Sequence, residues 1–423
     1  MLDGYHFDPD YQRAVREAGH RLLVFDDYNH LPHYHANILL NQNMGSETIS
    51  YSYDSDTVGL FGPKYALLRS EFLARKNRIQ EQTQRGRKVL VTLGGADPDN
   101  ITLKVLRALL QTGLDDLEVN IVAGPVNPNV KILKSEIENA RQLGRTVNLP
   151  VRLLRDANMP ELMDGAKLAV SAGGSTCWEL CFFGVPILVI ISAENQRASA
   201  RGLHRTGAAL SLGWHEDIEV SELAEAIESL INNPKKLESM SSQGMNVVDG
   251  QGSERILTLM EWFAKAADRE DIPLRKATRE DCYQLWSLAN DIEVRRNSFN
   301  PEPIPYEQHV RWFEEKLKSS SSTIYVLDVS GVLLAQVRYD RKDEIAEIDY
   351  AVIPGFRGKS LGTKILELTW ESASRELEVS GVKGIVKQDN KASAFSFLKA
   401  GFEKTKCENY LGFDCIFFEK RLN

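Results

Sequence analysis

Two stretches of the chain place a pair of glycines directly after an apolar run and before a predicted helix. From Val170 to Glu179 the sequence is VSAGGSTCWE, which predicts a buried strand, a glycine turn and a helix from about Ser175. The segment that begins at Gly94 has the same order. Glycine lets a ligand approach the backbone, and the free N–H groups of a helix N-terminus favour an anion. The pattern indicates a phosphate site, although an ordinary strand–turn–helix connection explains it equally well.

Glu179 adds a second chemical property to the first of these stretches. It is the only charged residue between Lys167 and Glu194, and it falls one turn into the predicted helix. A carboxylate at this place could accept hydrogen bonds from both hydroxyls of a ribose. The combination of a phosphate turn and a ribose acceptor indicates a nucleotide.

The composition limits the classes of protein and partner. The chain has 423 residues, enough for two or three domains, and its 43% hydrophobic and 26% charged residues are typical of a globular protein. The formal net charge is -8 and no Lys/Arg cluster stands out, so we expect no nucleic-acid partner. The longest uncharged apolar run, 180–193, is too short to cross a bilayer, so we expect no membrane partner.

Cysteine and histidine positions give no metal-ligand pattern. The five cysteines are odd in number and lack metal-ligand spacing, which predicts reduced thiols and a cytoplasmic protein. Of the eight histidines, His30, His33 and His35 flank Pro32 in a loop, and we interpret them as structural or surface residues. We therefore expect no metal.

The order of the predicted elements divides the chain into three parts. Residues 1–87 form half of a Rossmann-type domain that lacks its opening strands, followed by a crossover with a charged helix at 70–84. Residues 88–268 alternate strands with helices, which predicts a parallel sheet whose glycine-rich loops meet at the carboxyl edge. Residues 272–423 follow a polar connection and have the order of a separate α+β domain. The fold class is therefore α/β, with a truncated first domain, followed by an α+β domain.

The last of these parts contains two motifs of one family. The run from Arg357 to Gly362 is RGKSLG, and the run from Asn390 to Phe402 is NKASAFSFLKAGF. They resemble the pyrophosphate loop and the second signature of the GCN5-related N-acetyltransferase (GNAT) family. Successive backbone N–H groups at a helix N-terminus suit a diphosphate. The resemblance implies acetyl-CoA as the acetyl donor, bound by Val352, Arg357, Gly358, Lys359, Ser360, Leu361, Gly362, Thr363, Asn390 and Phe397.

The sequence departs from this family at two positions. Ser360 stands where the family usually has glycine, which requires a backbone conformation that a non-glycine residue tolerates. Phe397 stands where many members carry a tyrosine that protonates the departing thiolate, so the general acid stays open and water could serve. Glu347 and Asp349 lie on one face of the strand that enters the loop, and they are candidate catalytic bases, directly or through water. The alternative is that both carboxylates merely face solvent.

The remainder, from residue 1 to about 265, resembles a second family. The matching pieces begin at Asp3, Asp26, Leu39, Tyr65, Gly94, Ser171 and Glu194. They look like the UDP-2,4-diacetamido-2,4,6-trideoxy-β-L-altropyranose hydrolases of pseudaminic acid biosynthesis, which are relatives of GT-B glycosyltransferases. The resemblance implies two GT-B-like lobes, of which the first is incomplete. It also implies that the carboxy-terminal domain is similar to the acetyltransferase that makes the hydrolase's substrate.

The resemblance assigns roles that the chemistry supports. Tyr5 and Asn195 are implied as catalytic residues that flank the sugar. The UDP-sugar is implied to contact Gly94, Gly95, Ala96, Leu154, Gly174, Ser175, Thr176, Glu179, Asn195 and Gln196. The family's catalytic histidine lies in a glycine-rich loop near the start of the first domain, and this sequence has no such loop. We therefore expect an impaired hydrolase.

Three interpretations follow. The first is a bifunctional pseudaminic acid enzyme that N-acetylates a UDP-4-amino-4,6-dideoxy sugar and hydrolyses the UDP-sugar product. The second is a GT-B glycosyltransferase fused to an acetyltransferase. The third is an acetyltransferase with a non-catalytic nucleotide-binding scaffold. The expected partners are a UDP-amino-sugar and UDP, although protein amino termini are an alternative acetyl acceptor, and the sequence does not set the oligomeric state.

Overall fold

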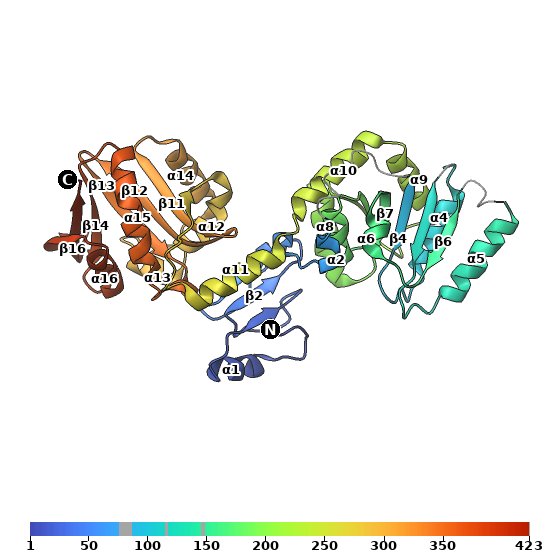
Figure 1. The fold of residues 1–423 in the computed structure, drawn as a ribbon, viewed down its shortest axis with the longest axis horizontal. Coiled ribbons are helices and arrows are strands. Elements are labelled where there is room, and N and C mark those ends of the chain that lie inside the picture. The colour runs from blue at the N-terminus through green and yellow to red at the C-terminus, as the bar shows by residue number, and fades with distance from the viewer. Residues whose placement is uncertain (76–86, 115–116, 145–148, 423) are drawn as a thin grey trace. The chain divides into compact units, whose positions relative to one another are not determined.

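The structure is a computed structural model that describes residues 1–75, 87–114, 117–144 and 149–422 (Figure 1). These residues form two compact units. The first consists of Met1–Tyr53 and Gly59–Ser253, and the second of Asp54–Val58 and Glu254–Asn423. The first unit therefore contains both parts that the sequence analysis separated at residue 87. Most of α11 (Gly252–Lys265), which the sequence analysis placed before the last domain, belongs to the second unit.

A small sheet forms near the start of the first unit. Its elements are α1 (Pro9–Glu17), β1 (Leu23–Phe25), β2 (Ile38–Asn41), η1 (Ser46–Thr48), β3 (Val58–Phe61), η2 (Pro63–Tyr65) and α2 (Ser70–Leu73). β2 lies between β1 and β3 and runs parallel to β1. α1 starts at Pro9 because the Asp8 carboxylate accepts a hydrogen bond from the Tyr11 N–H, and proline needs no donor there. The predicted helix at 70–84 is seen only as the short α2, since residues 76–86 lie outside the described residues.

The larger sheet of the first unit is parallel, as the alternation of strands and helices predicts. Its strands are β4 (Lys88–Thr92), β5 (Glu118–Val122), β6 (Val151–Leu154), β7 (Ala166–Ala172), β8 (Ile187–Ile191) and β9 (Ala209–Trp214). Their order is β6-β5-β4-β7-β8-β9, and every neighbouring pair is parallel. The chain moves outward from β4 to β6 and then returns to the other side of β4. The strand order therefore reverses between β4 and β7, where sheets of this kind bind ligands beyond the carboxyl ends of the strands.

Helices bury both faces of this sheet, which explains why its central strands β4, β7 and β8 are mostly apolar. The helices are α4 (Ile101–Gln111), α5 (Val130–Gln142), α6 (Met159–Met163), α7 (Thr176–Phe182), α8 (Arg197–Thr206), α9 (Val220–Ile231) and α10 (Pro234–Val247), with η3 (Glu194–Gln196) before α8. Val89 and Val91 of β4 pack in one core with α4 and α9, whereas Leu90 packs in a second core with α7 and α8. A strand that is buried on both faces needs apolar side chains at every position.

Asp97 closes the N-terminus of α4, and its replacement by alanine is expected to destabilise the first unit. The buried carboxylate accepts hydrogen bonds from the N–H groups of Ile101 at 2.8 Å and Thr102 at 3.0 Å. Loss of such a cap costs about 1–2 kcal/mol of unfolding free energy. Urea-induced unfolding of Asp97→Ala should show this loss. The matched Asp99→Ala variant removes an exposed carboxylate and should change the unfolding free energy by less than about 0.5 kcal/mol; equal losses in both variants would contradict the assignment.

The second unit is built on a mostly antiparallel sheet. Its strands are β10 (Leu274–Lys276), β11 (Ser322–Val329), β12 (Val332–Lys342), β13 (Ile345–Val352), β14 (Gly381–Lys387), β15 (Glu403–Tyr410) and β16 (Phe413–Arg421). Their order is β10-β11-β12-β13-β14-β16-β15. The pair β13 and β14 is parallel, while the other neighbouring pairs are antiparallel. The α+β organisation predicted for this part is confirmed.

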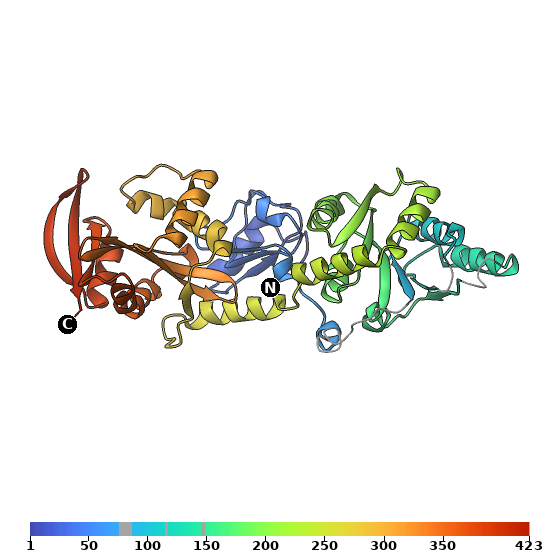
Figure 2. The same cartoon turned by 90° about the horizontal axis from the view of Figure 1, so that it is seen from above.

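Helices cover both faces of this sheet (Figure 2). They are η4 (Arg279–Asp281), α12 (Cys282–Ala289), α13 (Ile292–Asn297) and α14 (Tyr306–Lys318) before the central strands, and η5 (Pro354–Phe356), α15 (Leu361–Glu376) and α16 (Lys391–Lys399) after them. Alternate residues of β12 identify the faces, because the Arg338 guanidinium lies over Trp312 of α14 and the Tyr339 hydroxyl bonds Thr369 of α15. Among the helices of the described ranges, none is long and apolar enough to cross a bilayer.

The parallel pair β13 and β14 separates along its length. Their register joins Ile345 to Gly381 and continues only to Ile348 opposite Gly384, although β13 runs on to Val352 and β14 to Lys387. On its other side β13 stays paired with β12 over its whole length. The last residues of β13 therefore present one edge of their backbone to a gap within the sheet.

Candidate functional site

A cavity of about 720 Å³ lies where β13 and β14 separate. It is lined by the last residues of both strands, by the loop that leads into α15, by α16 and by the end of α13. Nine of the ten residues that the sequence assigns to acetyl-CoA line it, namely Val352, Arg357, Gly358, Ser360, Leu361, Gly362, Thr363, Asn390 and Phe397. The exception is Lys359. A gap in a sheet can accept an extended chain through backbone hydrogen bonds, as an added strand does.

The loop before α15 offers backbone donors at a helix N-terminus. Gly358 has φ 74° and Ser360, which precedes the helix, has φ 61°. Ser360 thus adopts the left-handed conformation that favours glycine, which explains why the family usually has glycine there. In the described part of the chain, no side chain makes a capping hydrogen bond to this helix. Because α15 has 16 residues, its first N–H groups form a favourable place for an anion.

Two basic side chains of this loop are directed at the protein. The Arg357 guanidinium donates to the Val352 carbonyl at 3.1 Å and forms an ion pair with Asp291. The Lys359 ammonium donates to the Phe263 carbonyl at 3.2 Å, and its residue is absent from the cavity lining. The Lys359 side chain therefore holds the loop against α11, and the contact of Lys359 with the cofactor stays a prediction. Only the Lys359 backbone is left to face a diphosphate.

Phe397 is a packing residue at the inner wall of the cavity. Its ring is 2% exposed, stacks on Phe418 at 5.3 Å between centroids, and meets Tyr350 at 5.7 Å. A Cβ on Gly384 would lie 2.3 Å from this ring, so β14 requires glycine beside it. The neighbouring Tyr350 supplies the hydroxyl that Phe397 lacks, since it lines the cavity and is hydrogen-bonded to side chains of α16.

The two candidate bases have different surroundings. Glu347 forms an ion pair with Lys383 at 3.1 Å and is absent from the cavity lining. Asp349 lines the cavity, has a side chain that is 57% exposed, and accepts a hydrogen bond from Gln336 at 3.0 Å. Their placement on one face of β13 fits the sequence prediction, but only Asp349 is placed where an amine could reach it.

The nucleotide residues predicted in the first unit gather at the carboxyl edge of its large sheet. Gly94 follows β4 and Gly174 follows β7, and the last residues of these strands are paired as Thr92 and Ser171. Four residues of these two turns are exposed, namely Gly94, Gly95, Ala96 and Ser175. The turns follow β4 and β7, the two neighbouring strands between which the strand order reverses. The sequence therefore identified the two turns that meet at the switch point. The N-terminus of α4, in contrast, is already occupied by the Asp97 carboxylate.

Gln196 connects the loops that follow β7 and β8. Its side-chain oxygen accepts hydrogen bonds from the Gly173 N–H at 3.2 Å, and from the Ser192 N–H at 3.0 Å and hydroxyl at 3.1 Å. The oxygen is thus used to fix the two loops rather than to face a ligand. Asn195, the residue before it, is exposed in η3. Gln196 positions the loops, and Asn195 is free to contact a ligand.

Glu179 is held by an arginine that lies 110 residues away in the sequence. The Arg69 guanidinium contacts one Glu179 oxygen at 3.2 Å, and the glutamate side chain is 16% exposed. Burial raises the pKa of Glu179, while the charge of Arg69 and its hydrogen bond oppose this shift. In the described residues the Ser175 hydroxyl makes no capping bond to α7. A ligand that uses Glu179 has to compete with Arg69 for its oxygens.

Leu154 and Tyr5 are two further predicted site residues. Leu154 ends β6, which is separated from β4 by β5, and its carbonyl accepts the Ala123 N–H. Tyr5 lies in a turn before α1, and its hydroxyl donates to Asp27 at 2.6 Å. This bond raises the pKa of Tyr5. Among the described residues, no hydrogen bond joins Tyr5 to Asn195, and their joint role at a sugar stays a prediction.

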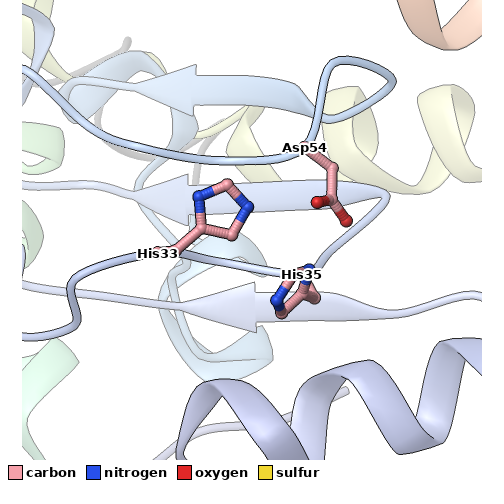
Figure 3. A group of neighbouring side chains, drawn as sticks. All are labelled: His33, His35 and Asp54. Carbon is pink, nitrogen blue, oxygen red and sulfur yellow. The ribbon is translucent and has the colours of Figure 1, made fainter.

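The loop histidines differ from one another. His30 is nine-tenths buried and contacts the Asp26 carboxylate at 2.6 Å, which agrees with the structural one of the two expected roles. His33 and His35 are half-exposed, with ring centroids 4.7 Å apart, and Figure 3 draws them with Asp54. His33 contacts the Ser52 hydroxyl and His35 the Arg13 guanidinium. Because Asp54 belongs to the other compact unit, we assign no metal site to these three residues.

Two family models match the chain. Residues 106–253 match the glycosyltransferase family 28 C-terminal domain, and residues 271–403 match the acetyltransferase (GNAT) domain. The chain is a fusion of these two domain types. The residues that match the GT28 model lie in the first unit, which contains the large parallel sheet. The residues that match the GNAT model lie in the second unit. The GT-B-like and GNAT fold classes expected from the sequence are therefore confirmed.

Several known proteins are similar to the chain over different lengths. An uncharacterized Methanocaldococcus jannaschii protein, MJ1062, is 24% identical over 96% of this chain and 81% of its own. The spore coat polysaccharide biosynthesis protein SpsG of Bacillus subtilis is 27% identical over 59% of this chain and 72% of its own. A Caulobacter vibrioides UDP-N-acetylglucosamine–N-acetylmuramyl-(pentapeptide) pyrophosphoryl-undecaprenol N-acetylglucosamine transferase is 31% identical over 22% of this chain and 27% of its own.

Solved structures resemble the GNAT domain. The acetyltransferase YncA of Salmonella typhimurium, solved with acetyl-CoA, shares 20% identity and a TM-score of 0.32 over 36% of this chain and 94% of its own. A Staphylococcus aureus N-acetyltransferase shares 19% identity and a TM-score of 0.34 over 36% of this chain and 100% of its own. The assignment of the GNAT domain rests on the family model and on the geometry of β13, β14 and α15.

Proposed function

We propose that the chain is a bifunctional protein of nucleotide-sugar metabolism. Its GNAT domain transfers an acetyl group from acetyl-CoA to the amino group of a UDP-4-amino-4,6-dideoxy sugar. Its first unit binds a UDP-sugar and releases UDP by hydrolysis, with UDP-2,4-diacetamido-2,4,6-trideoxy-β-L-altropyranose as the substrate. The observation that supports this proposal most is the cavity between β13 and β14, which opens onto the uncapped N-terminus of α15.

The residues of the cavity fit the three chemical parts of acetyl-CoA. The diphosphate takes the N–H groups of the loop from Gly358 to Thr363. The amide-containing pantetheine arm takes the open backbone edge of β13 up to Val352. The adenine takes the outer part of the cavity along α16. Arg357 and Lys359 contribute by holding the loop in place.

Acetyl transfer requires two proton movements in this cavity. The amine must lose a proton before or as its nitrogen attacks the thioester carbon, and Asp349 is the carboxylate placed to accept it, directly or through water. The carbon–sulfur bond then breaks and its electron pair leaves with the thiolate, which takes up a proton. Phe397 has no proton to give, so this proton comes from water or from the Tyr350 hydroxyl.

Nucleotide binding in the first unit follows from the switch point. The turns at Gly94 and Gly174 place backbone N–H groups and the Ser175 and Thr176 hydroxyls at the carboxyl edge. Glu179 accepts the ribose hydroxyls once Arg69 gives up its oxygen, and the released guanidinium is then available to an anion. The names of the relatives that act in polysaccharide biosynthesis or on a UDP-sugar support this assignment.

An acceptor screen tests the acetyltransferase half. Release of free CoA from acetyl-CoA is measured with UDP-4-amino-sugars and with peptides that carry free amino termini. We expect the UDP-amino-sugar to give the higher rate per unit concentration. A rate that depends on the peptide alone would refute the sugar acceptor while leaving the acetyl donor in place.

A thermal-shift titration tests the nucleotide half. UDP at 100 times its dissociation constant stabilises a folded protein by about 2.7 kcal/mol. We expect UDP to raise the unfolding temperature of the first unit, and Glu179→Ala to weaken this rise. A protein that UDP does not stabilise would have no nucleotide site in this unit.

The family 28 match favours one alternative activity, which is glycosyl transfer to an acceptor other than water. The products distinguish the two reactions. Hydrolysis gives UDP and the free sugar without any acceptor, whereas a glycosyltransferase gives UDP in appreciable amount only when its acceptor is present. UDP binding without release in either condition indicates a non-catalytic scaffold.

Phe395 is expected to set the affinity for the nucleoside end of acetyl-CoA. Its ring is 64% exposed and lines the cavity, and the next residue, Ser396, lies 3.4 Å from a Cβ placed on Gly362. An exposed ring beside the diphosphate loop is available to stack on adenine, which is worth about 1–3 kcal/mol per base. Phe395→Ala should therefore raise the KM for acetyl-CoA about 10-fold and leave the KM for acetyl-pantetheine, which lacks the nucleoside, unchanged.

Leu398→Ala is the matched control for this prediction. Leu398 lies on the same helix, is 54% exposed and is absent from the cavity lining. We expect its KM for both donors to equal that of the native protein. Equal KM increases for both donors in Phe395→Ala would show that the ring supports the cavity wall and does not contact adenine.

A further inference from the structure

The cavity between β13 and β14 has walls on both faces of the sheet. Successive residues of β13 point to opposite faces. Tyr350 faces α16, because its ring meets the Phe397 ring at 5.7 Å between centroids. Asp349 faces α14, because it lies opposite Arg338 in the pairing of β12 and β13, and the Arg338 guanidinium lies over Trp312 of that helix. Since Tyr350 and Asp349 both line the cavity, it extends to both faces.

α13 forms a wall of the cavity on the Asp349 face. The residues of this helix that line the cavity are Glu293, Val294, Arg296 and Asn297. Burial lowers the pKa of Arg295, and the charge of Asp349 opposes this shift, which agrees with a position of α13 near Asp349. The acetyl donor is assigned to the opposite face, where a Cβ placed on Gly362 of α15 would lie 2.8 Å from the Tyr350 ring. The wall formed by α13 is therefore left for the acetyl acceptor.

Hydrogen bonds fix the backbone of this wall around Arg296. The Lys387 ammonium, at the end of β14, donates to the Arg296 carbonyl at 3.1 Å and to the Ser298 carbonyl at 2.7 Å. The Arg295 guanidinium donates to the Asn300 carbonyl at 3.2 Å. Two neighbouring basic side chains are thus used to hold the end of α13 and the turn that follows it.

The basic residues that line the cavity differ in what their side chains contact. They are Arg296, Arg357, Lys387 and Lys391. The Arg357 and Lys387 side chains donate to backbone carbonyls, and Lys391 begins α16 on the face assigned to the donor. The Arg296 side chain is 73% exposed and lies 3.5 Å from the Glu293 carboxylate one turn earlier in α13. An exposed ion pair of this kind is weak, so the Arg296 guanidinium can exchange it for a phosphate.

We infer that Arg296 binds a phosphate group of the acetyl acceptor, so that the acceptor is a phosphorylated amino-sugar and not a simple amine. The inference rests on the proposed function, in which the acceptor is a UDP-amino-sugar. A guanidinium can donate two parallel hydrogen bonds to the oxygens of one phosphate. In a UDP-4-amino-sugar the amine and the phosphate lie at opposite ends of the pyranose ring, which suits Asp349 and Arg296 as separate contacts.

An aromatic residue completes this wall. Phe299 lines the cavity three residues after Arg296, and its ring lies 5.3 Å from the Tyr410 ring between centroids. An aromatic ring offers a flat apolar face to the carbon atoms of a sugar ring. A cation and an aromatic ring on one wall suit a ligand that joins a phosphate to a sugar.

The carboxylates of the same wall would suit a different acceptor. Glu293 and Asp349 could together hold a second ammonium group, as in a polyamine. Each carboxylate already has a cation near it, however, since Glu293 is paired with Arg296, and Asp349 lies 3.8 Å from the Arg338 guanidinium. The charges of the wall therefore favour the phosphorylated acceptor, and the polyamine spermidine enters the test as the competing acceptor.

The Arg296→Ala variant tests this inference through the KM for the acceptor. We expect its KM for the UDP-4-amino-4,6-dideoxy sugar to rise by about 10-fold or more, because a hydrogen bond to a charged group contributes roughly this factor. Its KM for acetyl-CoA should stay that of the native protein. Its KM for the methyl glycoside of the same amino-sugar, which has no phosphate, should also stay unchanged. Arg296→Lys keeps the charge and should recover part of the lost affinity.

Arg311→Ala is the matched control. Arg311 is an exposed arginine of α14 that is absent from the cavity lining, so its removal should leave every KM unchanged. An unchanged KM of Arg296→Ala for the UDP-sugar, or equal rises for the UDP-sugar and the methyl glycoside, would overturn the inference while the sugar acceptor stands. If the native protein acetylates spermidine or a peptide and not the UDP-amino-sugar, the proposed acceptor is refuted and the inference falls with it.

Inhibition of the native protein by UDP tests the inference without any variant. UDP carries the diphosphate but has no amine to acetylate. We therefore expect it to inhibit acetyl transfer competitively with the UDP-amino-sugar and not with acetyl-CoA. Competition with acetyl-CoA would place UDP at the loop before α15 and contradict the inference, and so would a lack of inhibition at UDP concentrations far above the KM for the acceptor.

Discussion

The Asp349→Asn variant is expected to transfer acetyl groups at least about 100-fold more slowly than the native protein, since a positioned general base contributes roughly 10²–10⁴-fold. Asp349 is the carboxylate of β13 that lines the cavity, and asparagine keeps its size while it loses the ability to accept a proton. The hydrogen bond from Gln336 can be kept by the amide oxygen. The measurement is kcat for the preferred amine acceptor, with the KM for acetyl-CoA expected to stay unchanged.

Glu347→Gln is the control for this prediction. Glu347 shares a face of β13 with Asp349, but its carboxylate is paired with Lys383 outside the cavity. We expect its kcat to stay within threefold of the native value. If Glu347→Gln were the slower variant, the base would be reached from the Lys383 side and the assignment of Asp349 would be wrong. Equal small effects in both variants would indicate that water alone accepts the proton.

The Asp281→Ala variant is expected to lose about 2–3 kcal/mol of unfolding free energy in the GNAT domain. Asp281 is 3% exposed and accepts hydrogen bonds from Arg275 at 2.7 Å through both oxygens, and from the Thr278 N–H at 2.7 Å. Breaking a fully buried ion pair costs about 3–5 kcal/mol. The Arg275 side chain is 37% exposed and regains water when its partner is removed, so we place the loss below that range. Urea-induced unfolding measures it.

Acidification should remove the same contribution. Burial alone would raise the pKa of Asp281, but the hydrogen bonds and charge of Arg275 and the bond from Thr278 lower it overall from the ordinary value of 3.8. A lowered folded-state pKa means that the stabilisation is complete above pH 3.8 and is lost as the pH falls below it, toward the folded-state pKa. As the pH falls below 3.8, the unfolding free energy of Asp281→Ala should therefore decrease by less than that of the native domain. The neighbouring Glu280→Ala, at an exposed position, should behave like the native protein at every pH.

Local features of the two sites could be predicted from the sequence. The turns at Gly94 and Gly174 follow apolar strands, and the alternation of strands and helices requires a parallel sheet, so both turns had to reach the carboxyl edge. The loop from Arg357 to Gly362 is likewise a continuous motif. Each of these predictions depends on residues that are neighbours in the chain, and the structure places them as expected.

Side-chain partners that are distant in the chain could not be predicted. Arg69 reaches Glu179 across 110 positions, and Lys359 reaches the Phe263 carbonyl across 96. No spacing rule connects such pairs, so a basic residue in a phosphate-type loop is assigned to the phosphate when its side chain in fact holds another helix. The hydrogen bond from Tyr51 to Asp26 could not be predicted for the same reason, because Tyr51 comes 25 residues after Asp26.

With the proposed function, the early end of the pairing between β13 and β14 would make acetyl-CoA a structural component of the domain as well as a reactant. The backbone edge of β13 beyond Ile348 has no neighbouring strand in β14, so a ligand that occupies the gap completes the sheet. Its binding energy then adds to the folding stability of the domain, by about 1.4 kcal/mol for each tenfold excess over the dissociation constant. The amount of folded enzyme in a cell would accordingly follow the supply of acetyl-CoA. The abundance of the protein would then depend on the concentration of the compound that its reaction consumes.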